Sequence, residues 1–167
     1  MYGRLRAGVQ SGLLVLCGGL WAGSPQPGQA MGADPVPATP ALLVQCPAEV
    51  PEPDALCAAL TAALDTALDG AFDIRSRQIS AADRNAPLLL PEQAEAAGTV
   101  RLVLAGIGED RLSGHLEWQS GSTPPQQGPE VALDVMDASL SASMYPSFTR
   151  GLLTATPDLP ATWARTP

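Results

Sequence analysis

Strand-like and helix-like patterns alternate in the first half of the folded part of the chain. The short apolar run at 41–46 predicts a buried strand. Apolar positions then recur at helical spacing from Asp54, which is suited to the first turn or the N-cap, to the stop signal Gly70. A two-residue period over 71–79 predicts a second strand. The predicted order is therefore strand, helix, strand.

The expected helix has one clearly apolar side, within an arc of about 140°. It comprises Leu56, Cys57, Leu60, Ala63, Leu64, Ala67 and Leu68. The back of the helix carries Ala55, Ala58, Ala59 and Ala62. These alanines fit either an exposed surface or the seat of a second packed layer. We favour the exposed surface, because alanine is simply the best helix former.

The second half contains a hairpin and a closing strand and helix. Residues 99–107 and 111–120 flank the turn "GED", which is typical of an antiparallel hairpin. Residues 131–137 predict a further strand. The helical spacing that follows is interrupted by Pro146, so we expect a kink or two short helices there. The segment 80–98 gives no clear pattern beyond a helical turn near its end.

Alternation in the second arm of the hairpin separates two faces. Its inward side chains are expected to be Leu112, Gly114, Leu116 and Trp118. Its outward ones are expected to be Ser113, His115, Glu117 and Gln119. On the earlier strand, Arg75 and Arg77 face outward in the same way.

Together these elements predict an α+β fold over residues 41–155. We expect a mostly antiparallel sheet of roughly four to five strands, with two main helices packed on one face. The polar half of each strand would form the opposite face, open to solvent or to a partner. Residues 31–40 are rich in Pro and Ala and predict a flexible tether, and residues 156–167 are expected to be irregular. Trp163 in that tail suits either a docking segment or packing back onto the domain, and we favour packing.

This element order resembles a known family. An alanine- and leucine-rich helix, the stretch "GAFDIRSR", an inserted loop and the hairpin "TVRLVLAGIGEDRLSGHLEW" lie between an opening strand and a closing strand and helix. They are similar to the amino-terminal α/β domain of TolB-like periplasmic proteins, over roughly residues 41–153. The resemblance implies a non-catalytic domain that docks envelope partners. The β-propeller of that family has no counterpart here, so none of its functions is implied.

Residues 1–30 have the features of an export signal. Arg4 and Arg6 precede a short apolar stretch, and the segment ends in small residues at Ala30. The stretch is far shorter than the roughly 20 residues that span a bilayer, so a membrane anchor is disfavoured. Leu16 stands where a lipoprotein needs a small residue before Cys17, so lipidation is disfavoured as well. We expect a cleaved signal peptide and a periplasmic location.

The charge of the chain limits its partners. It contains no lysine, and loss of Arg4 and Arg6 with the signal would take the formal net charge from −8 to −10. Phosphate backbones and anionic lipids repel such a protein, so nucleic acid and membrane surfaces are not expected partners.

Two cysteines remain after the signal, Cys46 and Cys57. Their spacing fits neither a CxxC redox motif nor a zinc ligand pair, and an exported chain is oxidised. We therefore expect a structural disulfide. The carboxylates are scattered along the sequence, so we expect no metal site. The one G-x-G motif lies in a turn with no helix after it, so we expect no phosphate-binding loop and no cofactor.

The remaining candidate residues are Arg75, Arg77, His115 and Glu117, which we predict as a possible interaction surface. A hydrolase would need Ser113, His115 and Glu117 as a relay, but side chains two apart on a strand project in parallel, about 6.6 Å apart. The leading hypothesis is a non-catalytic periplasmic protein that binds an envelope protein. The alternative is a small-ligand-binding protein with a pocket between the sheet and the 80–98 loop, and a small hydrolase is the least favoured.

Overall fold

The structure, a computed structural model, describes residues 38–83, 85–136 and 138–164. The expected signal peptide and residues 31–37 of the expected tether lie outside this range. Residues 38–40 have no regular structure and are exposed. None of the described helices has both the length and the hydropathy to cross a membrane.

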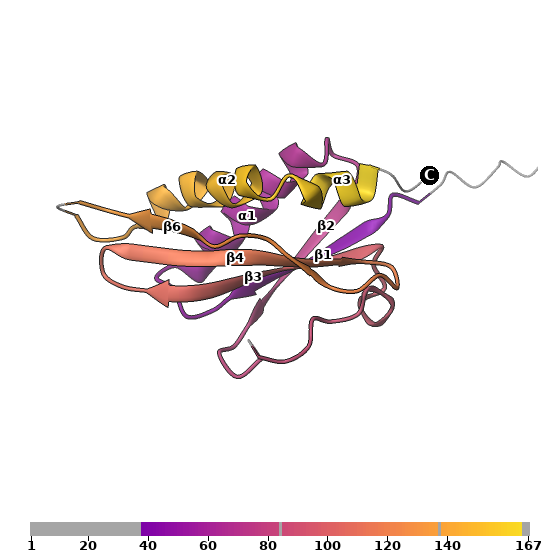
Figure 1. Cartoon of the computed structure of the whole chain (residues 1–167), viewed down its shortest axis with the longest axis horizontal. Helices are drawn as coiled ribbons and strands as arrows, with labels where there is room; N and C mark the ends of the chain where they lie inside the picture. The colour runs from indigo at the N-terminus through magenta and orange to yellow at the C-terminus, as the bar shows by residue number, and fades with distance from the viewer. Residues whose placement is uncertain (1–37, 84, 137, 165–167) are drawn as a thin grey trace, which may run out of the picture. The chain divides into compact units, whose positions relative to one another are not determined.

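The described chain forms one sheet with helices on one face and a long loop on the other (Figure 1). The strands are β1 (Ala41–Pro47), β2 (Asp73–Ile79), β3 (Gly98–Ile107), β4 (Arg111–Ser120), β5 (Gln126–Gln127) and β6 (Val131–Asp134). The helices are α1 (Pro53–Ala67), α2 (Tyr145–Ala155) and α3 (Asp158–Ala164), with 3-10 turns at Pro91–Ala94 and Ala142–Met144. The predicted α+β class is confirmed.

The sheet is mixed, in the order β2-β1-β3-β4-β5, with β6 also paired to β4. Strand β1 is parallel to both β2 and β3, whereas β4 is antiparallel to β3, β5 and β6. The parallel part follows from α1, because a helix between two strands returns the chain to the end at which the first strand began. There are six strands rather than four or five, since β5 and β6 are two short pieces beside the same side of β4.

The core lies between the sheet and the helices. From α1 it takes Leu56, Cys57, Leu60 and Leu64, as the helical spacing predicts. The alanine side of α1 is divided: Ala55 and Ala59 are half-buried, and Ala58 and Ala62 are exposed. The half-buried pair packs against the core because α2 lies alongside, where Thr149 Oγ1 donates to the Ala59 carbonyl over 3.4 Å. A second packed layer therefore exists on part of this side.

Helix α2 begins at Tyr145, immediately before Pro146, and does not kink at the proline. A 3-10 turn ends at Met144, and Pro146 occupies the first turn of α2, where the missing N–H is no loss. The Tyr145 hydroxyl donates to the Pro51 carbonyl and fastens this helix to the turn before α1. Burial, and then the negative charge of Glu52, raise the pKa of Tyr145 above its ordinary value.

The segment after residue 156 is not irregular throughout, because Asp158–Ala164 form α3. Trp163 is buried on this helix and meets Phe72 edge to face, with ring centroids 6.1 Å apart. Its indole lies so close over Gly98 that a β-carbon there would come within 2.7 Å of the ring. Trp163 thus packs back onto the domain, as favoured above.

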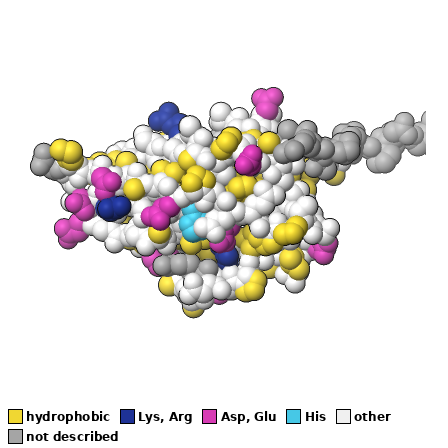
Figure 2. All heavy atoms as spheres, in the orientation of Figure 1, with side chains coloured by type: hydrophobic (Ala, Val, Ile, Leu, Met, Phe, Trp, Pro, Cys, Tyr) yellow, Lys and Arg dark blue, Asp and Glu magenta, His cyan; other side chains and the backbone are white. Residues whose placement is uncertain are grey.

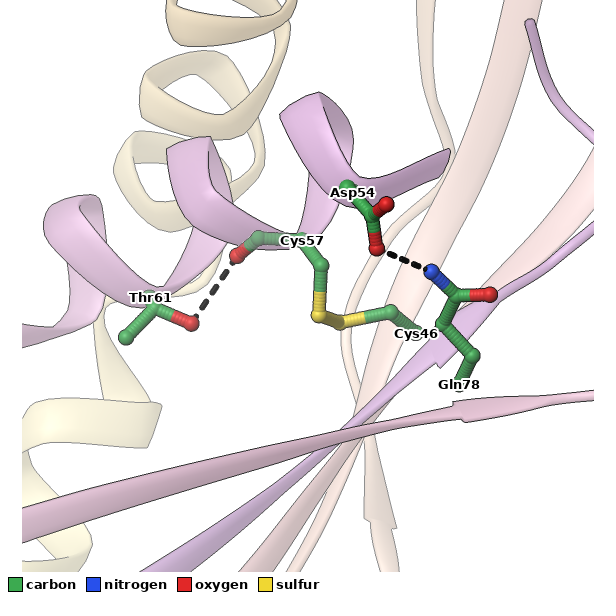
Figure 3. Close-up of a disulfide and its surroundings, with 5 residues drawn as sticks. All are labelled: Cys46, Asp54, Cys57, Thr61 and Gln78. Atoms are coloured by element: carbon green, nitrogen blue, oxygen red, sulfur yellow. Dashed lines mark hydrogen bonds between the residues drawn. A yellow bond between two sulfur atoms is a disulfide. The ribbon is translucent and has the colours of Figure 1, made fainter. Parts of the chain in front are cut away.

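The predicted disulfide joins Cys46 at the end of β1 to Cys57 in α1, with Cα atoms 5.5 Å apart (Figure 3). On the neighbouring turns of α1, Thr61 Oγ1 donates to the Cys57 carbonyl over 2.9 Å, and Gln78 of β2 donates to Asp54 over 2.5 Å. The start of α1 is therefore held to both β1 and β2.

Reduction of this disulfide is expected to lower the melting temperature by roughly 10 °C. Closing a loop of this length stabilises a domain by about 3 kcal/mol through the entropy of the unfolded chain. Thermal unfolding with and without reductant measures the effect. As a control, the double variant Cys46→Ala/Cys57→Ala should melt at a lower temperature than the parent protein and should not respond to reductant. If reduction leaves the melting temperature of the parent protein unchanged, the disulfide is contradicted.

Gly98→Ala is expected to cost about 2 kcal/mol of unfolding free energy, because the new methyl group would overlap the Trp163 ring. Gly108→Ala is the matched control, since the nearest atom to its β-carbon is 3.6 Å away, and should change stability by less than about 0.5 kcal/mol. Denaturant unfolding of both variants measures the difference. Equal stabilities would show that Trp163 does not rest on Gly98.

Candidate functional site

The four predicted surface residues lie in two separate places on the sheet. Arg75 and Arg77 are on β2 at one edge, whereas His115 and Glu117 are on β4. Strands β1 and β3 lie between them. Three strand spacings correspond to about 14 Å, so the four side chains do not form one cluster.

Glu117 is bound by a residue that the sequence analysis did not single out, Arg101 of β3. Arg101 Nη2 and Nε donate to Glu117 Oε2 over 2.5 and 2.9 Å, and Nη1 donates to the Ala86 carbonyl over 2.7 Å. The two side chains are 7% and 23% exposed. His115 Nε2 lies 3.8 Å from the other Glu117 oxygen, Oε1. The hydrogen bond from Arg101 to Ala86 thus fastens the loop between β2 and β3 to the sheet, and the ion pair with Glu117 holds the guanidinium in place.

This loop covers much of the face that was expected to be open. Of the polar side chains on that face, Gln45, Thr99, Arg101, Ser113 and Gln119 are buried. The expectation of a fully open polar face is therefore wrong. Burial is tolerated at Arg101 because its guanidinium is paired and hydrogen-bonded.

A groove of about 350 Å3 remains between the loop and the outer strands. Leu88 and Leu90 form one wall, Gln126 and Gln127 the other, and the Arg101–Glu117 pair lies among its lining side chains. The sequence analysis placed its alternative ligand pocket between the sheet and this loop.

The three residues of the hydrolase hypothesis do not form a relay. Ser113 is buried, and among the described residues His115 Nε2 has no hydrogen-bond partner. Glu117 is committed to Arg101. Within the described ranges, no group of three or more His, Cys, Asp or Glu side chains is placed to hold a metal ion.

A different candidate site lies at β2, the open edge of the sheet. Among the described strands it pairs only with β1, and its residues from Arg75 to Gln78 are exposed. The Asp73 N–H donates to the Pro40 carbonyl and the Ile79 carbonyl accepts from Ala48, so the odd-numbered residues bond to β1. In a parallel ladder the even-numbered residues then direct their backbone groups outward.

A groove of about 660 Å3 runs beside this edge, between β2 and α1. On the strand side it is lined by Ile74, Ser76, Arg77 and Gln78, and on the helix side by Asp54, Cys57, Ala58, Thr61, Ala62 and Asp65. Figure 3 shows part of its lining, with the Asp54–Gln78 hydrogen bond across the end near the disulfide. The outward backbone groups of β2 therefore have a groove of small and polar side chains next to them.

The opposite edge of the sheet is less able to pair with a further strand. Strands β5 and β6 are short, Pro125 precedes β5, and Pro129 lies between the two. Proline has no N–H to offer and is one of the devices that protect sheet edges from further pairing. Edge β2 contains no proline.

Strand β2 carries more basic than acidic side chains, whereas the chain as a whole is acidic. Acidic side chains outnumber basic ones on the face in Figure 2. Glu109 and Asp110 are exposed in the turn between β3 and β4, and Asp134 is exposed at the end of β6. Strand β2 instead carries two exposed arginines, of which Arg75 Nε lies 3.0 Å from Asp73. Both of those side chains are more than half exposed, at 61% and 54%, so this ion pair is weak and leaves the guanidinium accessible.

Arg101→Leu is expected to lower the free energy of unfolding by about 2 kcal/mol, because it leaves a partly buried Glu117 unpaired. Hydrogen exchange should also quicken in residues 80–97, since the loop loses its anchor at Ala86. Arg111→Leu is the matched control: its ion pair with Asp134 spans 3.5 Å and is exposed, so the loss should stay within about 0.5 kcal/mol. Equal effects of the two substitutions would contradict this role of Arg101.

Comparison with known proteins supports no argument about the fold or the function of this chain. No family model and no curated protein sequence matches the chain. Among solved structures, it is similar to a PelC dodecamer from Paraburkholderia phytofirmans, with 13% identity and a TM-score of 0.44. That similarity covers 70% of this chain and 87% of the other. At this level of similarity no function follows from the match.

Proposed function

We propose that this protein is an exported, non-catalytic protein that acts through protein–protein contacts in the cell envelope. The observation that carries the proposal is the open edge of β2, with its exposed arginines and the groove beside it. Unpaired strand edges are common sites of protein recognition, because they offer a row of hydrogen-bonding groups.

Two further features support the proposal. The Cys46–Cys57 disulfide is typical of proteins that fold in an oxidising compartment, which agrees with the export signal expected in residues 1–30. His115 Nε2 has no hydrogen-bond partner among the described residues, and Glu117 accepts from Arg101 instead. Ser113, His115 and Glu117 therefore do not form a hydrogen-bonded relay, which favours a binding role over hydrolysis.

The β2 surface is tested by reversing its charge in the mature protein. Arg75→Glu/Arg77→Glu should abolish the retention of a specific envelope protein from an extract of the source cells, because it reverses the charge that β2 offers to a partner. Arg111→Glu is the matched control, since Arg111 is an equally exposed arginine on β4, and should retain that protein. Quantitative mass spectrometry measures how much of each retained protein binds to the variants relative to the parent protein. If every retained protein binds all three forms equally, contact through β2 is excluded.

A further inference from the structure

We infer that β2 receives an extended segment of a partner protein as an added strand, and that this segment carries acidic side chains two residues apart. This inference deepens the proposed function and rests on it. Its basis is the combination of backbone direction, groove and charge at one edge.

The backbone supplies the binding groups. Because Asp73 and Ile79 bond to β1, the N–H and C=O groups of Ile74, Ser76 and Gln78 point away from the sheet. An extended peptide alongside can pair with all three residues. Main-chain hydrogen bonds of this kind give affinity in strand addition, whereas the pockets for alternate side chains give specificity.

The side chains of β2 define two different faces for such a peptide. By strand alternation the side chains of Arg75 and Arg77 lie on the face away from α1, in register with Leu43 and Gln45 of β1, although Arg77 also borders the groove. A residue of the added strand opposite each arginine would have its Cβ within about 5.5 Å of the arginine Cβ. Two acids separated by one residue therefore match the two arginines.

The other face of the peptide would point into the groove beneath α1. Ala58, Thr61 and Ala62 leave room there for small side chains, whereas Asp54 and Asp65 would repel acids. The fitting segment thus alternates acidic residues with small β-branched ones. Such alternation gives the segment a single productive register, because a slip by one residue would exchange its two faces.

A second copy of this chain fits the edge less well than an acidic segment does. Antiparallel pairing of two β2 strands, centred on Ser76, would place Arg75 opposite Arg77 twice. Centring the pair on either arginine would place that residue opposite itself, and only the register centred on Arg75 offsets this by placing Arg77 opposite Asp73. Like charges directly opposite each other destabilise a strand pair. The first 37 residues of the chain do not fit either, because Asp34 is their only acid.

The direct test uses three synthetic peptides with a fluorescent label, titrated against the mature protein at low salt. Peptide TVEVEVT should bind about tenfold more tightly than TVKVKVT, because the lysines would face the two arginines. It should also bind more tightly than TVEEVVT, which has the same composition but places its acids on opposite faces. Fluorescence anisotropy measures the affinities. Equal binding of the three peptides, or binding of none, would overturn the inference.

The second test separates backbone pairing from charge attraction. Ser76→Pro removes an outward N–H without breaking the ladder to β1 and should weaken binding of TVEVEVT about tenfold or more. Ser76→Val keeps the N–H and should bind like the parent protein. Hydrogen exchange in the unsubstituted protein gives an independent reading: the peptide should protect the amides of Ser76 and Gln78, while those of Arg75 and Arg77 are protected already. Binding without that protection would exclude strand addition.

The two proposals can fail separately. If an envelope protein is lost on Arg75→Glu/Arg77→Glu but TVEVEVT does not bind, the partner docks on β2 through side chains, and only the inference fails. If TVEVEVT binds as expected but no retained envelope protein depends on the arginines, the edge is competent for strand addition and the proposed cellular role fails.

Discussion

Strand β1 is the element on which the rest of the sheet depends. It is hydrogen-bonded on both sides and covalently joined to α1 through Cys46. Its side chains at Leu42, Val44 and Cys46 are fully buried beneath that helix. Because β2 has no other strand neighbour among the described residues, its position is determined by β1 and by the Gln78–Asp54 contact with α1. The groove beside β2 is therefore bounded by elements that are tied to each other.

The two faces of the sheet are covered by different physical means. The helix face is buried by apolar packing, which is not directional and which tolerates alternatives. The other face is covered by a loop held through the Arg101–Glu117 pair and the Ala86 carbonyl. A partly buried ion pair adds little net stability, but it strongly penalises the loss of one partner. Its contribution is thus mainly to fix where the loop lies.

The sequence predicted the helices and strands more accurately than it predicted which strands pair with each other. The two-residue period of β4 and the helical spacing of α1 follow directly from side-chain burial, and both were correct. The parallel pairing of β1 with β2 was missed, although a strand–helix–strand order is itself its signal. Pro146 was interpreted as a break, whereas tertiary contacts of Tyr145 place it at the start of α2.

The candidate site was predictable only in part. A hairpin turn at residues 108–110 already implies that Arg101 lies opposite Glu117, so that pair could have been found. The exposure of Arg75 and Arg77 could be predicted from the alternation of apolar and polar residues along β2 alone. The open edge beside them could not be predicted, because it depends on which strand lies outermost, and no local pattern encodes that order. The helical fold of α3 likewise depends on the contact of Trp163 with Phe72 and Gly98.

The asymmetry between the two sheet edges has a consequence for stoichiometry. An added strand would itself present a free outer edge, but that edge would belong to the partner and not to this chain. The side at β5 and β6 is short and flanked by proline, which disfavours a further strand there, and the arginines of β2 disfavour a second copy. If β2 accepts a strand as proposed, its single edge has room for one partner segment, so complexes through β2 would be one-to-one.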